Sequence, residues 1–241
     1  MVEPMFRADL SSVSEGTFTL TGTEAKHAAN VRRMRVGESI QVADGAGKRL
    51  RGSVAKVESG EVVIQVNSLA QETEPRVQLT LVQALAKGDR DELAIQAASE
   101  LGVMRVIPWQ AENSVSRWDA AKAKKGQERW QSIVIEAAKQ ALRSFDPVVE
   151  PLHSTPQLLQ NLTGQRLVLD PTASTTLKQL GTFGPEVSLV VGPEGGISEK
   201  ELVAFENAGF VRVRLGAEIL RTSTAGISTI SAIAAVAGLW D

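Results

Sequence analysis

The sequence contains no cysteine, and this absence removes several classes of chemistry at once. Without thiols the chain has no disulfide, no thiolate nucleophile and no thiolate-ligated zinc or iron–sulfur site. Histidine is almost as scarce, since only His27 and His153 occur, and this disfavours a histidine-rich metal site. We therefore expect a protein that binds no metal.

Signals for secretion and membrane insertion are also missing. The first ten residues, MVEPMFRADL, contain no basic segment followed by an apolar run. The longest stretch of low charge, Ala225–Trp240, is shorter than the roughly 20 residues that span a bilayer. We expect a cytosolic protein with no membrane partner.

Several common nucleotide-binding and hydrolytic motifs are absent. The loop Ala86–Arg90, which follows the first predicted strand of the α/β region, is not glycine-rich and holds no G-x-G-x-x-G. The chain also contains no G-x-x-x-x-G-K-[ST], no G-x-S-x-G and no H-E-x-x-H. A dinucleotide-binding oxidoreductase therefore becomes a minor alternative, and Walker-type NTPases, α/β hydrolases and zinc proteases are disfavoured.

Charge is distributed unevenly along a chain that is nearly neutral overall, with 26 basic and 28 acidic side chains. Between Lys26 and Lys56 eight basic residues face only two acidic ones, whereas residues 151–241 hold six basic and eight acidic residues. Such an asymmetry suits an N-terminal module that contacts phosphates. A solvated strand surface in a balanced protein is the alternative.

The first 70 residues have the short alternating segments typical of β-strands. The expected strands are Thr17–Leu20, Ser39–Ala43, Arg49–Val57 and Glu61–Val66. One short helix is expected over Thr23–Arg33, with Thr23 as a candidate cap, and the polar segment Ser68–Arg76 is the expected linker. This pattern predicts a small β-barrel or sandwich.

From residue 77 onward, strands alternate with helices. Apolar runs predict strands over Gln78–Leu85, Val103–Pro108, Arg166–Asp170, Val187–Val191 and Val211–Leu215. Helices are expected over Gly88–Leu101, Lys125–Arg143, Thr175–Leu180, Ser198–Ala208 and Thr224–Leu239. This alternation predicts a mainly parallel α/β sheet covered by helices on both faces.

Two loops after late strands are the candidate ligand site, because α/β sheets bind ligands beyond the carboxyl ends of their strands. The first, Gly192–Gly196, has three glycines that allow close backbone approach, and it precedes a Ser198–Glu201 capping box. The second, Leu215–Ala225, offers an apolar slot for a flat ring and Arg221 for a carboxylate or phosphate. Ordinary turns before capped helices remain the simpler interpretation of each loop alone.

These residues together resemble a known family. G-P-E-G-G-I-S-x-x-E at 192–201 and L-G-x-x-I-L-R-T at 215–222 resemble the C-terminal signature of the RsmE family of SPOUT-class methyltransferases. The resemblance continues in order through the N-terminal H-x-x-x-V-x-R at 27–33 and D-G at 44–45. It also includes K-G-D-R at 87–90 and E-A-A-x-Q-x-x-R at 136–143, so it covers nearly the whole chain.

The resemblance implies an α/β fold with an N-terminal PUA-like β-barrel and a C-terminal α/β SPOUT domain containing a trefoil knot. Residues 1–72 would be the RNA-binding barrel, 73–241 the methyltransferase domain, and about 187–241 the knot. It further implies a homodimer in which Thr224–Leu239 contributes to the interface. The implied activity is methylation of uracil N3 in 16S ribosomal RNA of the small (30S) subunit.

The resemblance also implies S-adenosylmethionine as cofactor and assigns residues to it. The implied cofactor-binding residues are Leu169, Val191, Gly192, Pro193, Gly195, Gly196, Leu215, Gly216, Ile219, Leu220, Thr222 and Ala225. Removal of the N3 proton requires a base or a cation that stabilises the uracil anion. Arg221 is the candidate cation and Glu194 the candidate base.

RNA contacts are expected on the barrel. The candidate RNA-binding residues are Arg7, His27, Arg32, Arg33 and Arg35. Packing or capping is the simpler interpretation of His27 alone. Shape and RNA context would then supply the specificity that a moderate basic patch does not.

Three positions depart from the family pattern. Arg32 replaces a leucine, Asn113 stands where an arginine is common, and Ser223 replaces the glutamate of R-T-E-T-A. Ser223 matters most because it lies in the second loop, and we interpret it as dispensable for the chemistry or as replaced in that role by Glu194 or Glu218. Two further alternatives remain open: a SPOUT enzyme acting on transfer RNA, and a non-catalytic RNA-binding relative.

Overall fold

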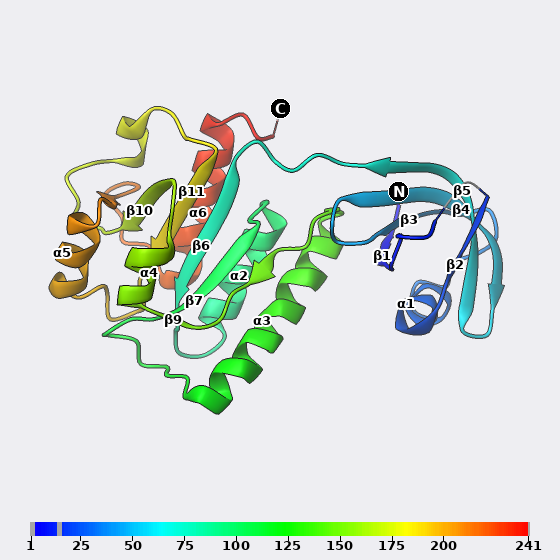
Figure 1. Cartoon of the computed structure of the whole chain (residues 1–241), viewed down its shortest axis with the longest axis horizontal. Helices are drawn as coiled ribbons and strands as arrows, with labels where there is room; N and C mark the ends of the chain where they lie inside the picture. The colour runs from blue at the N-terminus through cyan, green and yellow to red at the C-terminus, as the bar shows by residue number, and fades with distance from the viewer. Residues whose placement is uncertain (1–2, 14–15, 241) are drawn as a thin grey trace. The chain divides into compact units, whose positions relative to one another are not determined.

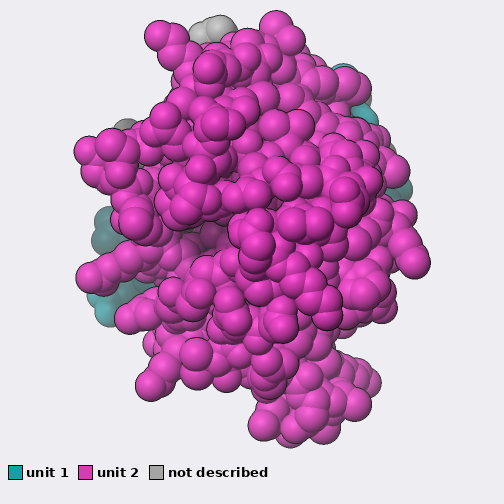
Figure 2. Space-filling model, turned by 90° about the vertical axis from the view of Figure 1, so that its left-hand side faces the viewer, with its two compact units in different colours: residues 1–74, 138–146 teal, residues 75–137, 147–241 magenta. Residues whose placement is uncertain are grey.

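The computed structural model describes residues 3–13 and 16–240, which fall into two compact units (Figures 1 and 2). Unit 1 comprises Met1–Glu74 together with Ala138–Asp146. Unit 2 comprises Pro75–Ala137 and Pro147–Asp241. The division cuts through one long helix, α3 (Ala120–Gln140), so the last turn of this helix belongs to unit 1.

Unit 1 is a curled five-stranded sheet in the order β1-β3-β4-β5-β2 (Figure 1). Its strands are β1 (Met5–Arg7), β2 (Thr17–Leu20), β3 (Ser39–Ala43), β4 (Lys48–Glu58) and β5 (Glu61–Gln71). Alternate apolar residues point inward to one core that includes Phe6, Ile40, Leu50 and Ile64. Strands β2 and β3 have the predicted bounds, and β4 is one residue longer than predicted at each end. Strand β5, however, continues five residues beyond the prediction and occupies the start of the expected linker.

The helical segment of unit 1 corrects the sequence prediction. Helix α1 covers Gly22–Lys26 and begins after Thr21, so Thr23 is not its cap. A π-helical turn, η1 (His27–Val31), follows, and its wider hydrogen bonding includes Arg32 N–H to His27 O at 2.9 Å. The segment ends where Arg33 adopts a φ of 52°, a left-handed conformation that a helix does not continue.

Ion pairs attach the segment Ala138–Asp146 within unit 1. Asp146 accepts from Arg7 at 2.6 Å, and Lys139 donates to Glu24 at 3.0 Å. Arg49 donates to the carbonyl of Leu142 at 2.7 Å. These two ion pairs and one hydrogen bond join residues more than 90 positions apart in the chain. The helical periodicity of residues 125–143 therefore predicted the helix but not the contacts of its last residues with unit 1.

Unit 2 is built on a parallel sheet in the order β12-β10-β11-β6-β7-β8, with β9 paired to β7. The strands are β6 (Gln78–Ala84), β7 (Arg105–Gln110), β8 (Val148–Val149), β9 (His153–Ser154), β10 (Gln165–Leu169), β11 (Glu186–Val191) and β12 (Val211–Val213). The prediction of a mainly parallel sheet is confirmed, although β8, β9 and the edge strand β1 of unit 1 were missed. Strands of two or three residues carry no readable alternation.

Helices cover both faces of this sheet, as predicted. They are α2 (Arg90–Glu100), α4 (Thr155–Asn161), α5 (Glu199–Asn207), α6 (Thr222–Val236) and the 3₁₀ turn η2 (Leu177–Leu180), besides α3. Successive residues of β6 point to opposite faces: Leu81 packs with residues of α2, α3 and α6, and Val82 with residues of α4 and α5. Helix α4 was not predicted, and the helix expected over Thr175–Leu180 is only the 3₁₀ turn.

Two local predictions about unit 2 were wrong. Strand β7 does not end at Pro108 but continues to Gln110. Val106 O accepts from Glu150 N–H, next to β8, and Trp109 O accepts from Leu85 N–H, next to β6. Because the backbone groups of successive strand residues point to opposite sides, the nitrogen of Pro108 points into the gap between β8 and β9, where no hydrogen-bond donor is needed. Helix α3 also begins at Ala120 and ends at Gln140, not at the predicted Lys125 and Arg143.

Candidate functional site

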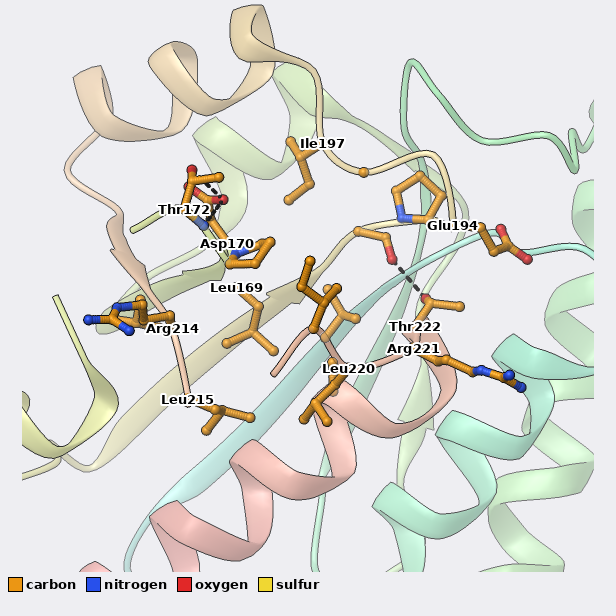
Figure 3. Close-up of a pocket in the computed structure, with 18 of the residues that line it drawn as sticks. Leu169, Asp170, Thr172, Glu194, Ile197, Arg214, Leu215, Leu220, Arg221 and Thr222 are labelled. Atoms are coloured by element: carbon orange, nitrogen blue, oxygen red, sulfur yellow. Dashed lines mark hydrogen bonds between the residues drawn. The ribbon is translucent and has the colours of Figure 1, made fainter. Parts of the chain in front are cut away.

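A cavity of about 660 Å³ opens in unit 2 beyond the carboxyl ends of β10, β11 and β12 (Figure 3). Because these strands are parallel and adjacent, the loops that follow them meet at one edge of the sheet. The start of α6 closes a further side. This is the position that the sequence predicted for a ligand site, and its volume suits a ligand of several hundred daltons.

Most of the predicted cofactor residues line this cavity. The lining includes Leu169, Val191, Gly192, Pro193, Gly196, Leu215, Gly216, Ile219, Leu220, Thr222 and Ala225, together with Glu194 and Arg221. Gly195 is not among the lining residues; a Cβ there would lie 3.1 Å from both Cβ and O of Asn113. The structure thus brings two loops that are separate in the sequence to the same cavity.

Glycine at position 192 permits the tight path of the first loop. A Cβ on Gly192 would lie 2.6 Å from Cγ1 of Ile197, closer than real Cβ contacts allow, and Ile197 itself lines the cavity. Gly196 has a φ of 75°, which favours glycine. Helix α5 then begins at the predicted capping box, with Ser198 Oγ accepting from Glu201 N–H.

Residues outside the loop brace it on two sides. Asn113 Nδ2 donates to Gly196 O at 3.2 Å from the segment after β7. On the other side, Glu194 Oε1 accepts from Lys87 N–H at 2.9 Å and from Arg90 Nη1 at 3.1 Å, and both donors follow β6. The departure from arginine at position 113 therefore places an amide against the loop backbone.

The electrostatics of Glu194 follow from these bonds. Burial raises the pKa of its carboxyl, but hydrogen bonds from its own backbone N–H, from Lys87 N–H and from Arg90 outweigh burial. The pKa of Glu194 therefore lies below its ordinary value of 4.5. Glu194 is ionised at neutral pH and is a weak proton acceptor while these bonds last.

Arg221 differs from the other charged groups around the cavity. Figure 3 shows its side chain extending away from the apolar side chains of Leu215 and Leu220. Within the described part of the chain its guanidinium has no ion-pair partner, and the residue is exposed. An arginine held at a cavity rim with its donors unused can meet an anionic group of a ligand.

A buried ion pair that was not predicted from the sequence lies in the cavity wall. Asp170, directly after β10, accepts from Arg212 Nη2 at 2.6 Å and from Thr172 N–H at 2.9 Å. Burial raises the pKa of Asp170, but these hydrogen bonds together lower it below 3.8. An aspartate immediately after a buried strand was the available signal.

The first two residues of α6 are both buried, but only Thr222 lines the cavity. Thr222 Oγ1 donates to Gly192 O at 2.7 Å and accepts from Gln83 Nε2 at 2.9 Å. Ser223 is 6 % exposed and does not line the cavity. The departure at position 223 therefore lies in the packed first turn of α6 and not in the cavity wall.

The candidate RNA-binding residues of unit 1 fall into two groups. Arg32, Arg33 and Arg35 are exposed, as phosphate contacts require. The Arg7 side chain is 13 % exposed and engaged with Asp146, and His27 packs edge-on against Phe6 at 5.8 Å between ring centroids. The Arg7 and His27 side chains are therefore engaged within unit 1 in this structure, whereas the other three candidates are exposed.

Neither a metal site nor a membrane span is present in the described residues. No group of three His, Asp or Glu side chains there is arranged to hold a metal ion. No helix among residues 3–13 and 16–240 has the length and apolarity needed to cross a bilayer.

The chain matches two protein families along most of its length. Residues 73–234 match the family described as the RNA methyltransferase domain. Residues 20–67 match the family described as the RNA methyltransferase PUA domain. The first match contains every residue of the cavity wall described above.

Curated relatives extend the similarity to the whole chain. It is 37 % identical, over 100 % of its length and 95 % of the relative, to ribosomal RNA small subunit methyltransferase E of Mycobacterium bovis. It is 36 % identical, over 90 % of its length and 89 % of the relative, to the protein of the same name from Bacillus subtilis.

Solved structures agree with the sequence relatives. A ribosomal RNA small subunit methyltransferase E from Neisseria gonorrhoeae, bound to S-adenosyl methionine, superposes with a TM-score of 0.88 at 30 % identity over 98 % of each chain. A protein from Legionella pneumophila with the bound cofactor SAM superposes with a TM-score of 0.87 at 28 % identity, over 98 % of this chain and 99 % of that one.

Proposed function

The chain belongs to the ribosomal RNA small subunit methyltransferase E family, and on this premise we propose that it methylates N3 of a uridine in 16S ribosomal RNA. It is an S-adenosylmethionine-dependent rRNA methyltransferase. The observation that carries the finer proposal is the cavity beyond β10, β11 and β12, where two glycine-bearing loops meet beside the unpaired Arg221. We place the enzyme in the cytoplasm, where its RNA substrate is made.

The cavity fits S-adenosylmethionine in size and in the character of its walls. Apolar side chains of Leu169, Leu215 and Leu220 suit a flat adenine ring, and the bare backbone of Gly192 and Gly196 allows close approach. We propose that these residues and the rest of the cavity lining named above form the cofactor site. We include Gly195, which belongs to the same loop but faces Asn113 instead of the cavity. When bound, S-adenosylmethionine supplies a methyl group that its sulfonium has already activated.

The protein's own contribution is positioning and charge. A ring nitrogen that attacks the methyl group must lose its proton, and a fixed cation beside the ring stabilises the resulting anion. We propose that Arg221 is this cation, because its guanidinium is exposed and unpaired in the described structure. Glu194, our sequence-based candidate for the base, is held by Lys87 and Arg90, so we propose that it fixes the loop instead.

We propose that residues 1–72 form the RNA-binding domain and 73–241 the methyltransferase domain. The exposed arginines 32, 33 and 35 support this assignment for phosphate contact, whereas Arg7 and His27 are engaged with Asp146 and Phe6 within unit 1. Assembled 30S subunits are the proposed substrate, since a moderate basic patch relies on RNA shape for specificity.

We also propose a knotted, dimeric methyltransferase domain. Helix α6 packs against β6, β11 and α2 after the chain has crossed from β11 to β12 at the sheet edge, which is consistent with a knot over about 187–241. At the end of this region Val236 and Trp240 are 61 % and 57 % exposed, and Leu93 of α2 is 53 % exposed. Such apolar exposure suits a second copy of the chain.

Calorimetric titration with S-adenosylmethionine tests the cavity assignment, with NADH as the negative control. We expect saturable binding of S-adenosylmethionine alone. Leu220→Trp, which fills the cavity from its rim, should abolish binding in a protein that still unfolds cooperatively. Binding of NADH, or unchanged binding in Leu220→Trp, would contradict the assignment.

A further inference from the structure

A fully buried glutamine lies beneath the cofactor loops and was not among the expected site residues. Gln83, on β6, exposes none of its surface and pairs in register with Val191, the residue before Gly192. Its Nε2 donates to Thr222 Oγ1 at 2.9 Å and to the carbonyl of Ala84 at 3.2 Å. Gln83 therefore joins β6 to the first residue of α6.

Thr222 continues this connection to the glycine loop. Its Oγ1 donates to the carbonyl of Gly192 at 2.7 Å, the dashed line that ends on Thr222 in Figure 3. One hydroxyl can donate one hydrogen bond, so the proton of Thr222 is committed to Gly192 while its oxygen accepts from Gln83. Since Thr222 is 6 % exposed, both bonds are largely shielded from water.

The other end of the Gln83 amide indicates that this arrangement has a function beyond stability. Gln83 Oε1 is buried and has no hydrogen-bond partner among the described residues. Burying a polar atom without a partner destabilises a fold, and an apolar side chain of similar volume would avoid that cost. A buried polar atom without a partner calls for a specific explanation. Here the explanation is that Nε2 of the same amide must hold Thr222.

We propose that Gln83 and Thr222 form a relay that positions the Gly192 carbonyl, and with it the glycine loop, against the start of α6 for cofactor binding. Both are positioning residues: Thr222 also lines the cavity, but its hydroxyl is committed to Gly192 and acts through that carbonyl. The relay joins the two halves of the cavity wall through one buried chain of hydrogen bonds. This inference rests on the proposed function, because it assigns the relay to S-adenosylmethionine binding.

The test compares cofactor affinity with stability in the full-length protein. Gln83→Met removes the amide at similar volume, and Thr222→Val removes the hydroxyl at nearly constant shape. Because a buried hydrogen bond that orders the site is lost, each should weaken the dissociation constant for S-adenosylmethionine about tenfold. Gln83→Met should unfold at or above the wild-type temperature, since it removes the unpaired Oε1.

Two matched variants separate positioning from general packing. Thr222→Ser keeps the hydroxyl and should restore affinity to within about threefold of wild type. Thr229→Val removes another buried hydroxyl from the same helix, one that donates to Ala225 O at 2.8 Å and has no other partner in the described part of the chain. Thr229→Val should leave affinity unchanged. Steady-state kinetics should show a raised KM for S-adenosylmethionine in Thr222→Val with kcat little changed at saturation.

Each outcome decides the proposal. Loss of affinity in Gln83→Met without loss of stability, with rescue by Thr222→Ser, supports the relay. Wild-type affinity in Gln83→Met and Thr222→Val overturns it, as does an equal loss in Thr229→Val. If Thr222→Val fails to fold, Gln83→Met alone decides. A wild-type protein that does not bind S-adenosylmethionine would refute the proposed function itself, and the relay with it.

Discussion

Glu194 and Arg90 are joined across the cavity rim by a 3.1 Å ion pair that connects the loop after β11 to the loop after β6. The Glu194 side chain is 23 % exposed, whereas that of Arg90 is 49 % exposed. Lys87 N–H donates to the same carboxylate oxygen, so one atom of Glu194 holds both the start and the end of the facing loop. The consequence is a cavity rim whose geometry depends on a carboxylate that stays ionised.

Removing this carboxylate should loosen the rim. We expect Glu194→Ala to weaken S-adenosylmethionine binding about tenfold, roughly 1.4 kcal/mol, since charge-assisted hydrogen bonds contribute about that much and partial exposure reduces it. Glu199→Ala, at the same rim but with a carboxylate that is 76 % exposed and 3.9 Å from Arg212, is the control and should bind normally. Equal affinity of the wild type, Glu194→Ala and Glu199→Ala for S-adenosylmethionine would show that Glu194 does not contribute to cofactor binding.

The affinity for S-adenosylmethionine should depend on pH through the ionisation of Glu194. The pKa of Glu194 is lowered in the folded protein, so its contribution is fully present above the ordinary value of 4.5 and is lost as pH falls through the lowered pKa. We expect affinity in the wild type to be constant from pH 8 to about pH 5 and then to fall. The pKa of Asp170 is also lowered, so the acid limb should shrink in Glu194→Ala without vanishing. An ionisation near neutral pH that disappears in Glu194→Ala would instead mark Glu194 as the base.

Arg221 should matter for turnover more than for cofactor binding. Because its guanidinium lies free at the rim, Arg221→Ala should keep S-adenosylmethionine affinity within about threefold. Loss of a charge that stabilises the developing anion should lower kcat by on the order of 10²–10³. Single-turnover methylation of 30S subunits measures this. A variant with normal kcat and poor cofactor binding would reverse the assignment, making Arg221 a cofactor ligand.

Exposed arginines of unit 1 should set the affinity for RNA. We expect the pair Arg32→Ala and Arg35→Ala to weaken binding to 30S subunits and to lower the slope of log affinity against log salt by roughly 0.7–0.9 per arginine. Lys56→Ala is the control, since Lys56 is exposed but paired with Glu58 at 2.6 Å. An unchanged salt dependence in the double variant would move the RNA surface elsewhere.

The buried pair Lys139–Glu24 should stabilise unit 1. The Lys139 side chain is 4 % exposed, so Lys139→Met leaves Glu24 without its buried partner and should cost about 2–3 kcal/mol of unfolding free energy. The double variant with Glu24→Gln should recover part of this loss because no uncompensated carboxylate remains. Denaturant unfolding measures both, and additive losses in the double variant would mean that the pair contributes nothing.

Local periodicity and turn chemistry were sufficient for the strands around the cavity and for helix α5. The capping box Ser198–Glu201 and the apolar runs before it are contained in a few consecutive residues, so the sequence predicted the β11 loop and its place at the sheet edge. The resemblance to a methyltransferase family supplied the cofactor and the substrate, which no periodicity encodes.

Contacts between residues that are distant in the chain could not be predicted from the sequence. Nothing near Gln83 in the chain indicates that its amide meets Thr222, 139 positions later. Nothing near Lys139 in the chain indicates that its ammonium meets Glu24, 115 positions away. The π-helical turn after α1 likewise depends on backbone bonds that residue type alone does not specify.

Methyl transfer to assembled subunits is the decisive test of the proposed N3 methylation of 16S ribosomal RNA. Unmethylated 30S subunits and unmodified transfer RNA would be incubated separately with the protein and S-adenosylmethionine, and the digested nucleosides identified by mass spectrometry against authentic standards. We expect N3-methyluridine from 16S ribosomal RNA, about one per subunit for a single target, and none from transfer RNA. A methylated ribose, methylation of transfer RNA, or no product despite saturating cofactor would contradict the proposal.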